Sequence, residues 1–149
     1  MPAFNEEEVL PHSLAEAMAV LDDLCDDWEL VIVDDGSTDA TPRVLAAAAL
    51  EQPRLRVLSH QTNQGYAAAL IRGFSSCRCE AIFYTDADAQ FDLGELARAY
   101  PLLAHADMVA GWRRNRLSFG SLRGRASRQL GRVWLRAGYK LPARLNKVL

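Results

Sequence analysis

Hydrophobic residues along this chain alternate between short continuous runs and helix-like spacings. The continuous runs, each bounded by polar or turn-forming residues, predict strands at 29–35, 55–59, 81–86 and 107–111. Between them, apolar residues at helical spacing predict helices at about 11–24, 41–51, 65–75 and 93–103. Strands that alternate with helices of about ten residues are typical of βαβ units with a parallel sheet. We therefore expect an α/β fold whose ligand site lies beyond the carboxyl ends of the strands.

Composition is that of an ordinary globular domain. The 149 residues are half hydrophobic and 24% charged, which allows one domain with a sizeable core. No apolar run approaches the roughly 20 residues that span a bilayer, and the first ten residues do not resemble a secretory signal. Cys25, Cys77 and Cys79 are odd in number and form no metal-binding pattern. We interpret them as reduced thiols in a cytosolic setting.

Charge divides the chain near residue 112. Residues 1–112 contain all 19 acidic residues and six of the 17 Lys and Arg residues. Residues 113–149 contain the other 11 basic residues and no acidic residue. This asymmetry predicts a core at 1–112 and a basic segment at 113–149, within one domain, that faces an anionic partner or surface.

The stretch VIVDDGSTDAT (31–41) ends a predicted strand with two adjacent acids, Asp34 and Asp35. Asp, Gly, Ser and Thr are common turn formers, so a plain strand-to-helix turn is one interpretation. Capping of the next helix by Ser37, Thr38 or Asp39 explains one acid, but not two at the strand end. The other interpretation is that an acid here accepts hydrogen bonds from a ribose hydroxyl or a base.

A second acidic strand end follows at YTDADAQFD (84–92). In an extended segment alternate residues face one side, so Asp86, Asp88 and Gln90 would present three oxygen ligands together. Oxygen ligands suit Mg²⁺ or Mn²⁺, and such an ion would offset the repulsion between carboxylates and attract a diphosphate. The alternative is a solvated acidic turn, with Asp92 capping the next helix.

Other nucleotide-binding signatures do not occur in the sequence. Neither GxGxxG nor GxxxxGK[ST] is found, and the three histidines are scattered. The stretch TNQGYAAAL (62–70) places Asn63 and Gly65 just before an alanine-rich helix. Backbone N–H groups there would meet an anion or simply form a turn and cap, and the sequence favours neither.

The basic segment predicts two features. Arg113, Arg114 and Arg116 follow the last predicted strand, at the same edge as the acids, where guanidinium groups would clamp phosphate. Further on, arginines recur every four residues, at 128, 132 and 136, beside an apolar face that contains Trp134. Such a helix would lie on an anionic membrane surface or pack on the domain with its arginines solvated.

Five motifs stand in one order along the chain: PAFNEEE, VIVDDGSTDAT, NQGYAAAL, DADAQ and AGWRRNR. Together they resemble the family 2 glycosyltransferases, especially the dolichyl- or polyprenyl-phosphate mannosyltransferase-like branch, over nearly the whole chain. The resemblance implies a GT-A fold, a Rossmann-like and mostly parallel sheet flanked by helices. It also implies transfer of a sugar, with inversion, from a GDP- or UDP-sugar with Mg²⁺ or Mn²⁺. The family's strand before Pro2 and its downstream phosphate-binding segment have no counterpart, so we expect a chain truncated at both ends.

The resemblance also implies which residues bind the nucleoside. Pro2, Phe4 and Glu6 would contact the nucleotide, with Phe4 standing where the family usually has Tyr. Val33 and Asp35 would hold the base and the ribose.

A second group would act on the diphosphate. The resemblance places Asp86, Ala87 and Asp88 beside the diphosphate, with Asp88 and Gln90 as metal ligands. Arg113 would meet the donor phosphate. The catalytic set that follows is Asp86, Asp88 and Arg113.

The expected function is transfer of a sugar from a GDP-mannose- or UDP-glucose-type donor to a polyprenyl or dolichyl phosphate, at the cytoplasmic face of a membrane. A phosphate acceptor is already ionised near pH 7, which agrees with the lack of an obvious general base. Two alternatives stay open: transfer to a saccharide hydroxyl, and a non-catalytic module that binds nucleotide-sugar or membrane. Nucleic acid is not expected as a partner, because no RNA-binding signature accompanies the basic segment.

Overall fold

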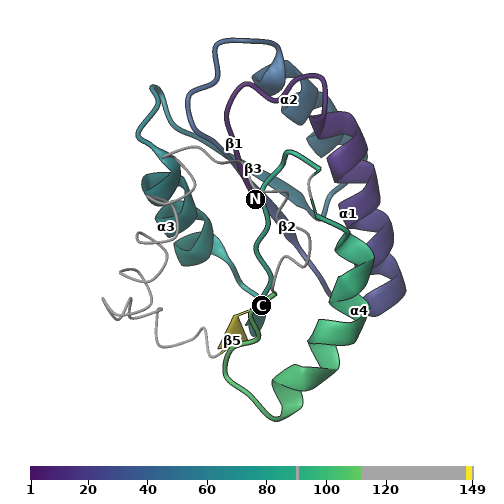
Figure 1. Ribbon diagram of the computed structural model, residues 1–149. Coiled ribbons are helices and arrows are strands. Elements are labelled where there is room, and N and C mark those ends of the chain that lie inside the picture. Colours follow the sequence, from purple (N-terminus) through teal and green to yellow (C-terminus); the bar gives the residue numbers. More distant parts are fainter. Residues whose placement is uncertain (90, 112–146, 149) are drawn as a thin grey trace, which may run out of the picture.

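The computed structural model describes residues 1–89, 91–111 and 147–148 (Figure 1). In chain order the elements are β1 (Pro2–Ala3), α1 (Leu10–Leu24), β2 (Leu30–Asp34), α2 (Thr41–Glu51), β3 (Leu55–Ser59), α3 (Tyr66–Ser76), β4 (Ala81–Ile82), the 3₁₀ turn η1 (Leu93–Glu95), α4 (Leu96–Ala99), the 3₁₀ turn η2 (Tyr100–Ala104) and β5 (Lys147–Val148). None of the helices in these ranges has the length and apolar composition needed to cross a bilayer.

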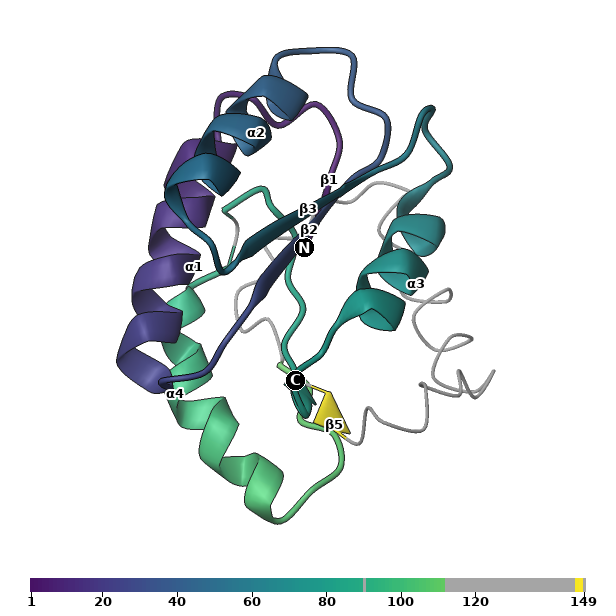
Figure 2. The ribbon, with the colours of Figure 1, turned by 180° about the vertical axis from the view of Figure 1, so that it is seen from behind.

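A three-stranded parallel sheet in the order β1-β2-β3 forms the centre of the fold. Helices α1 and α2 cover one face of this sheet and α3 covers the other (Figures 1 and 2). All five residues of β2 are buried, as expected for a continuous apolar strand that is covered on both sides. Val33 pairs with Pro2 of β1 and with Leu58 of β3, so β2 is the middle strand.

The core lies between α1, α2 and the sheet. Leu10, Leu14 and Ala17 recur at helical spacing on the buried face of α1. They belong to one apolar cluster with Ile32 of β2 and Leu45 of α2, both of which are completely buried. The amphipathic patterns of the first two helices are therefore satisfied by a shared core.

The predictions for the first 76 residues are confirmed. The three predicted helices match α1, α2 and α3 to within about a residue, and the predicted strands at 29–35 and 55–59 contain β2 and β3. All strand pairs in the described ranges are parallel, as expected. The PAFNEEE stretch, expected to enter a loop with its strand missing, contains the paired strand β1.

Further along the chain two predictions are confirmed only in part and one is wrong. In the stretch 81–86 only β4 is a strand, and it pairs with β5 in a separate two-stranded sheet. The stretch 107–111 contains a single bridge residue, Met108, instead of a strand. The expected helix at 93–103 is divided into η1, α4 and η2, and Pro101, which lacks the N–H that a continuous α-helix needs, stands near the start of η2.

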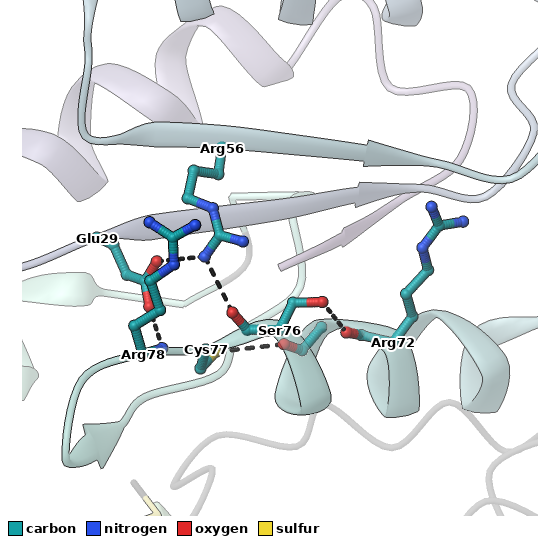
Figure 3. Close-up of polar contacts among 7 residues, drawn as sticks. Glu29, Arg56, Arg72, Ser76, Cys77 and Arg78 are labelled. Carbon is teal, nitrogen blue, oxygen red and sulfur yellow. Dashed lines mark hydrogen bonds and ion pairs between the residues drawn. The ribbon is translucent and has the colours of Figure 1, made fainter.

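Opposite charges are paired at the amino end of the sheet (Figure 3). Glu29, just before β2, accepts a hydrogen bond from Arg56 of β3 at 2.5 Å and another from the Arg78 backbone N–H. Arg56 also donates to the Ser76 carbonyl at the end of α3, at 2.9 Å. This cluster joins β2, β3 and the segment after α3 at the end of the sheet where β2 and β3 begin.

Candidate functional site

The loops that follow β1 and β2 are joined to each other at the carboxyl end of the sheet. The Asn5 backbone N–H donates to the Ser37 hydroxyl at 2.9 Å, and the Glu6 N–H donates to the buried Thr41 hydroxyl at 2.8 Å. In return, the Thr38 N–H donates to the Asn5 side chain at 2.8 Å. The two loops therefore form one surface, and any ligand above β1 also meets the loop after β2.

Capping at the start of α2 uses two acidic side chains from this surface. Asp39 accepts a hydrogen bond from the Thr41 N–H at 2.9 Å, and Glu7 accepts one from the Ala40 N–H. Of the three capping residues considered from the sequence, Asp39 is the one that bonds the first helical N–H. The buried Asp34 instead accepts from the Ser37 N–H at 3.0 Å within the turn.

Asp35 anchors the loop that leads from β3 to α3. Its side chain is buried, and its Oδ1 lies 2.6 Å from His60 Nδ1. The Gln64 N–H donates to the same oxygen at 2.9 Å, and the Gly65 N–H donates to Oδ2 at 2.8 Å. Because an ionised carboxylate only accepts hydrogen bonds, the proton of the first contact belongs to His60 Nδ1.

These contacts decide the charge of Asp35. Burial acts to raise the pKa of this carboxyl, but the hydrogen bonds from His60 and from the two backbone N–H groups outweigh it, so the pKa lies below its usual value. Asp35 is therefore ionised at neutral pH. The backbone N–H groups of Gln64 and Gly65, in the TNQG turn, therefore bind an anion that belongs to the chain itself, the Asp35 carboxylate.

Glycine is required where the loop after β2 meets the loop after β3. Gly36 has φ +71°, and a Cβ there would lie 2.4 Å from the Thr62 carbonyl carbon. Gly65 has φ +92° with open space around it, so the backbone conformation alone demands glycine at that position. The two glycines let Asp35 and the 60–65 loop come into direct contact.

The acidic segment after β4 is held from both sides. Ala87 is 2% exposed, and its carbonyl accepts a hydrogen bond from the Ser13 hydroxyl of α1 at 2.7 Å. Asp86 and Asp88, on either side of it, are half-buried. The alternation expected from an extended segment is thus present as far as Asp88, and the left-handed Ala89 (φ +53°) ends it.

Negative charges meet at this edge of the sheet. Partial burial, followed by the charges of Asp88, Asp39 and Asp86, raises the pKa of Glu6 above its usual value. The acids from the loops after β1, β2 and β4 are therefore close enough to repel one another. Such a surface attracts a cation or a ligand that brings one.

The acids offer part of a metal site. Within the described ranges, no group of three or more His, Cys, Asp or Glu side chains is arranged to hold a metal ion. Mg²⁺ sites, however, commonly use one or two carboxylates and complete the coordination with water and substrate phosphates. Asp86 and Asp88 fit that chemistry. The third expected oxygen ligand, Gln90, lies outside the described residues.

The residues expected to bind the nucleoside lie along β1 and β2. Pro2 pairs with the buried Val33, and Phe4 is 43% exposed at the start of the loop after β1. Glu6 is half-buried in that loop, and Asp35 is buried at the start of the loop after β2. The fold therefore brings all five to the carboxyl half of these two strands.

A mostly apolar cavity of about 590 Å³ lies beside the sheet. Its walls include Val31, Ala69, Phe74 and Leu96, from both helical layers. Pro2 and Val33 also line it, whereas the acidic side chains of the site do not. We therefore place the candidate site at the acidic loops and not in this cavity.

Three contacts of the site were not predicted from the sequence. The Ser13 bond to Ala87, the His60 contact with Asp35 and the 2.9 Å bond from the Tyr66 hydroxyl to Asp86 join residues that are 74, 25 and 20 positions apart. His60, one of the three scattered histidines, is buried. Asp92, expected as a cap, accepts from the Gly94 N–H at 2.9 Å.

The expected basic contributions fall outside the described residues. These are Arg113, Arg114 and Arg116, and the arginine stripe with its tryptophan-bearing face at 128–137.

The chain matches the family model described as "Glycosyl transferase family 2" over residues 1–147. It therefore belongs to glycosyl transferase family 2. The resemblance drawn from its five motifs is confirmed.

Curated relatives carry related descriptions. An undecaprenyl-phosphate 4-deoxy-4-formamido-L-arabinose transferase of Pseudomonas fluorescens (strain Pf0-1) is 37% identical over 122 residues, which are 78% of this chain and 35% of the relative. A dodecaprenyl-phosphate galacturonate synthase of Rhizobium johnstonii is 34% identical over 119 residues, again 78% of this chain and 35% of the relative. The chain thus spans about a third of the length of these relatives.

Solved structures agree on the fold. A mannosyltransferase, PcManGT from Pyrobaculum calidifontis, in complex with GDP-Man and Mn²⁺, has a TM-score of 0.63 and 28% identity, and the match covers 75% of this chain and 34% of that one. The TarS 1–349 structure from S. aureus has a TM-score of 0.61 and 23% identity, covering 80% and 38%. The expected GT-A fold, with a parallel sheet flanked by helices, is confirmed.

Proposed function

We propose that this chain is the nucleotide-sugar-binding core of an inverting glycosyltransferase that moves a sugar from a nucleoside diphosphate sugar to a polyprenyl phosphate. The observation that carries the proposal is the meeting of the loops after β1, β2 and β4 in one acidic surface, indicated by the raised pKa of Glu6. The descriptions of the relatives as polyprenyl-phosphate sugar transferases support the acceptor class. GDP-mannose- and UDP-glucose-type sugars are the donors to test first.

The nucleoside would lie along the ends of β1 and β2. Pro2, Phe4 and Glu6 would contact the nucleotide, and Val33 and Asp35 would hold the base and the ribose. The exposed ring of Phe4 supports this role, because a partly exposed aromatic side chain offers a face to a base. The ionised Asp35 would act as a hydrogen-bond acceptor.

The diphosphate would lie above the acidic segment after β4. Asp88 and Gln90 would hold Mg²⁺ or Mn²⁺, with Asp86 and Ala87 beside the diphosphate and Arg113 at the donor phosphate. The ion, when bound, would offset the carboxylate repulsion and stabilise the charge that grows on the leaving nucleoside diphosphate. The buried Ala87, fixed by Ser13, would keep the two neighbouring carboxylates turned toward the ligand.

The acceptor would need little chemical help. A lipid phosphate is ionised near pH 7 and attacks the anomeric carbon directly, so the protein has to position the reactants and exclude competing water. The basic segment at 113–149 would bring the chain to the cytoplasmic face of a membrane, where such a lipid is found. Its 11 basic residues without any acid support that role.

Calorimetry with the full chain tests the donor site. GDP-mannose and UDP-glucose are titrated with and without Mn²⁺ into the wild type and into Asp88→Ala. We expect one of the two sugars to bind more tightly with Mn²⁺, and this gain to be lost in Asp88→Ala. Asp23→Ala, which removes an exposed acid from α1, serves as the matched control and should keep the gain. An affinity that changes neither with Mn²⁺ nor in Asp88→Ala would contradict the metal site.

The acceptor is tested separately. The chain is incubated with labelled donor and either polyprenyl phosphate or a free saccharide, and the lipid and aqueous phases are counted. Label in the lipid phase that depends on Asp86 and Asp88 is the expected result. Label in a saccharide product would favour a hydroxyl acceptor, and donor binding without any product would favour a binding module.

A further inference from the structure

Tyr66, the first residue of α3, reaches across to the acidic segment after β4. Its hydroxyl donates a hydrogen bond to Asp86 Oδ1 at 2.9 Å. Partial burial and the neighbouring Asp86 carboxylate raise the pKa of Tyr66, so its hydroxyl keeps the proton that it donates. Neither the motif pattern nor the proposed site roles give this tyrosine a function.

The place of Tyr66 is determined by its neighbour in the chain. Gly65 donates its N–H to Asp35 Oδ2 at 2.8 Å and accepts, through its carbonyl, from the Ala69 N–H in the first turn of α3. Its φ of +92° turns the chain from the loop into the helix. The start of α3 is thus attached to Asp35, and Tyr66 follows immediately after the attachment point.

A short path of two hydrogen bonds and one peptide bond therefore joins the two acidic strand ends. Asp35, at the end of β2, accepts from the Gly65 N–H, and the next residue, Tyr66, donates to Asp86, beyond β4. Asp35 also contacts His60 and accepts from the Gln64 N–H, so three residues of the 60–66 segment bind this one carboxylate. The two acids are thus connected through two adjacent residues.

We propose that Tyr66 is a positioning residue that orients the Asp86 carboxylate for the diphosphate and its metal ion, and that the 60–66 segment links this orientation to the nucleoside end of the site. The inference rests on the proposed function. A carboxylate with one oxygen held by a phenol has fewer orientations to lose when a ligand binds. Tyr66 acts on the ligand only through Asp86.

The test is calorimetry of GDP-mannose and UDP-glucose binding, with and without Mn²⁺, on the wild type, Tyr66→Phe and Tyr100→Phe. The measured quantity is the ratio of the dissociation constants without and with Mn²⁺. We expect Tyr66→Phe to reduce this ratio about five- to tenfold, the effect of losing one ordinary hydrogen bond, and to leave metal-free affinity unchanged. Tyr100→Phe removes a hydroxyl from η2 and should leave both values unchanged.

Three other outcomes overturn the inference. A Tyr66→Phe ratio equal to that of the wild type would mean that the hydroxyl does not position Asp86. An equal loss with and without Mn²⁺ would mean that Tyr66 contacts the nucleotide itself. A wild type that binds neither sugar would remove the proposed function and this inference together, a result that is distinct from the first two.

A second variant addresses the link to Asp35. Gly65→Ala strains the backbone at φ +92° without placing its Cβ against any neighbour. We expect it to reduce the Mn²⁺-dependent ratio as Tyr66→Phe does, with circular dichroism as the check that the variant is folded. Addition of Tyr66→Phe to Gly65→Ala should then cause less than the sum of the two losses. Fully additive losses would show that the 60–66 segment does not carry the link.

Discussion

The two ends of the central sheet differ in how their acidic side chains are compensated. At the amino end, Glu29 is bonded to Arg56 and to a backbone N–H, and the two side chains are only 13% and 26% exposed. At the carboxyl end, Glu6 lies near Asp86 and Asp88, and its partial burial together with these like charges raises its pKa. The amino end therefore holds a structural ion pair, whereas the carboxyl end holds acidic side chains that a bound cation would stabilise.

The difference lies in what satisfies the acids. At the carboxyl end the partners of Asp35 and Asp39 are chiefly backbone N–H groups, hydroxyls and one imidazole, which fix positions without supplying a full compensating charge. Repulsion between acids costs folding stability, so its presence at one edge of the sheet is typical of a functional site. Each prediction below breaks or sharpens this contrast, from the largest expected effect to the smallest.

Gly36→Ala should be the most damaging of these changes. A Cβ at position 36 would lie 2.4 Å from the Thr62 carbonyl carbon, and the residue would have to keep a φ of +71°. We therefore expect a loss of about 3 kcal/mol in the free energy of unfolding, measured by urea denaturation. Gly65→Ala has the unfavourable φ alone and should cost about 1 to 2 kcal/mol. Gly111→Ala, with open space and no positive φ, is the control. Equal effects in all three would contradict a tight loop contact.

Asp35→Asn should cost about 2 kcal/mol at pH 7, because an amide leaves at least one of the three donors to Asp35 without an acceptor. The pKa of Asp35 is lowered by folding, so its contribution is fully present above its ordinary value near 3.8 and is lost as pH falls through the folded value. The difference between wild type and variant should therefore shrink below about pH 4. A difference that is constant from pH 7 to pH 3 would show that the charge of Asp35 does not contribute.

Glu29→Gln removes the acid at the amino end and should lower the free energy of unfolding by about 1 kcal/mol. The loss should be smaller in 1 M salt, because screening weakens the ion pair in the wild type. The exposed pair of Glu95 and Arg98 provides the control, since Glu95→Gln should change stability by less than about 0.5 kcal/mol. Donor binding should be unaffected by either change.

Glu6→Gln, at the carboxyl end, should raise the free energy of unfolding instead of lowering it. The pKa of Glu6 is raised by folding. Ionised Glu6 therefore lowers the free energy of unfolding above the folded pKa, and this effect disappears below the ordinary value near 4.5, where the side chain is protonated. At pH 7 the variant should be more stable than the wild type by about 0.5 kcal/mol, and the gain should vanish near pH 4. A loss of stability in Glu6→Gln at pH 7 would remove the contrast between the two ends.

Local pattern was enough to predict the first half of the fold. The helices and strands up to residue 76 follow from apolar spacing, because α1, α2 and β2 bury faces that the sequence itself displays. The strands expected at 81–86 and 107–111 are reduced to β4 and to a single bridge residue for a different reason. A strand exists only where a neighbour accepts its hydrogen bonds, and a local apolar run does not contain that information.

The same distinction holds for the site. Asp35, Asp86 and Asp88 could be identified because acids at the end of an apolar strand are unusual in sequence. The groups that hold them could not, because Ser13, His60 and Tyr66 come from other elements and meet the acids only after folding. A serine on a buried helix face was the one available signal, since a buried hydroxyl needs a partner.

The number of hydrogen bonds that Asp35 accepts limits what else it can bind. An ionised carboxylate has about four lone-pair positions, and three of those on Asp35 accept from His60, Gln64 and Gly65. Two of the three fall on Oδ1, so among the contacts within the described residues the remaining position is on Oδ2. A ligand bound to Asp35 as proposed would therefore present a single hydrogen-bond donor there, and a planar group with two parallel donors would find only one acceptor.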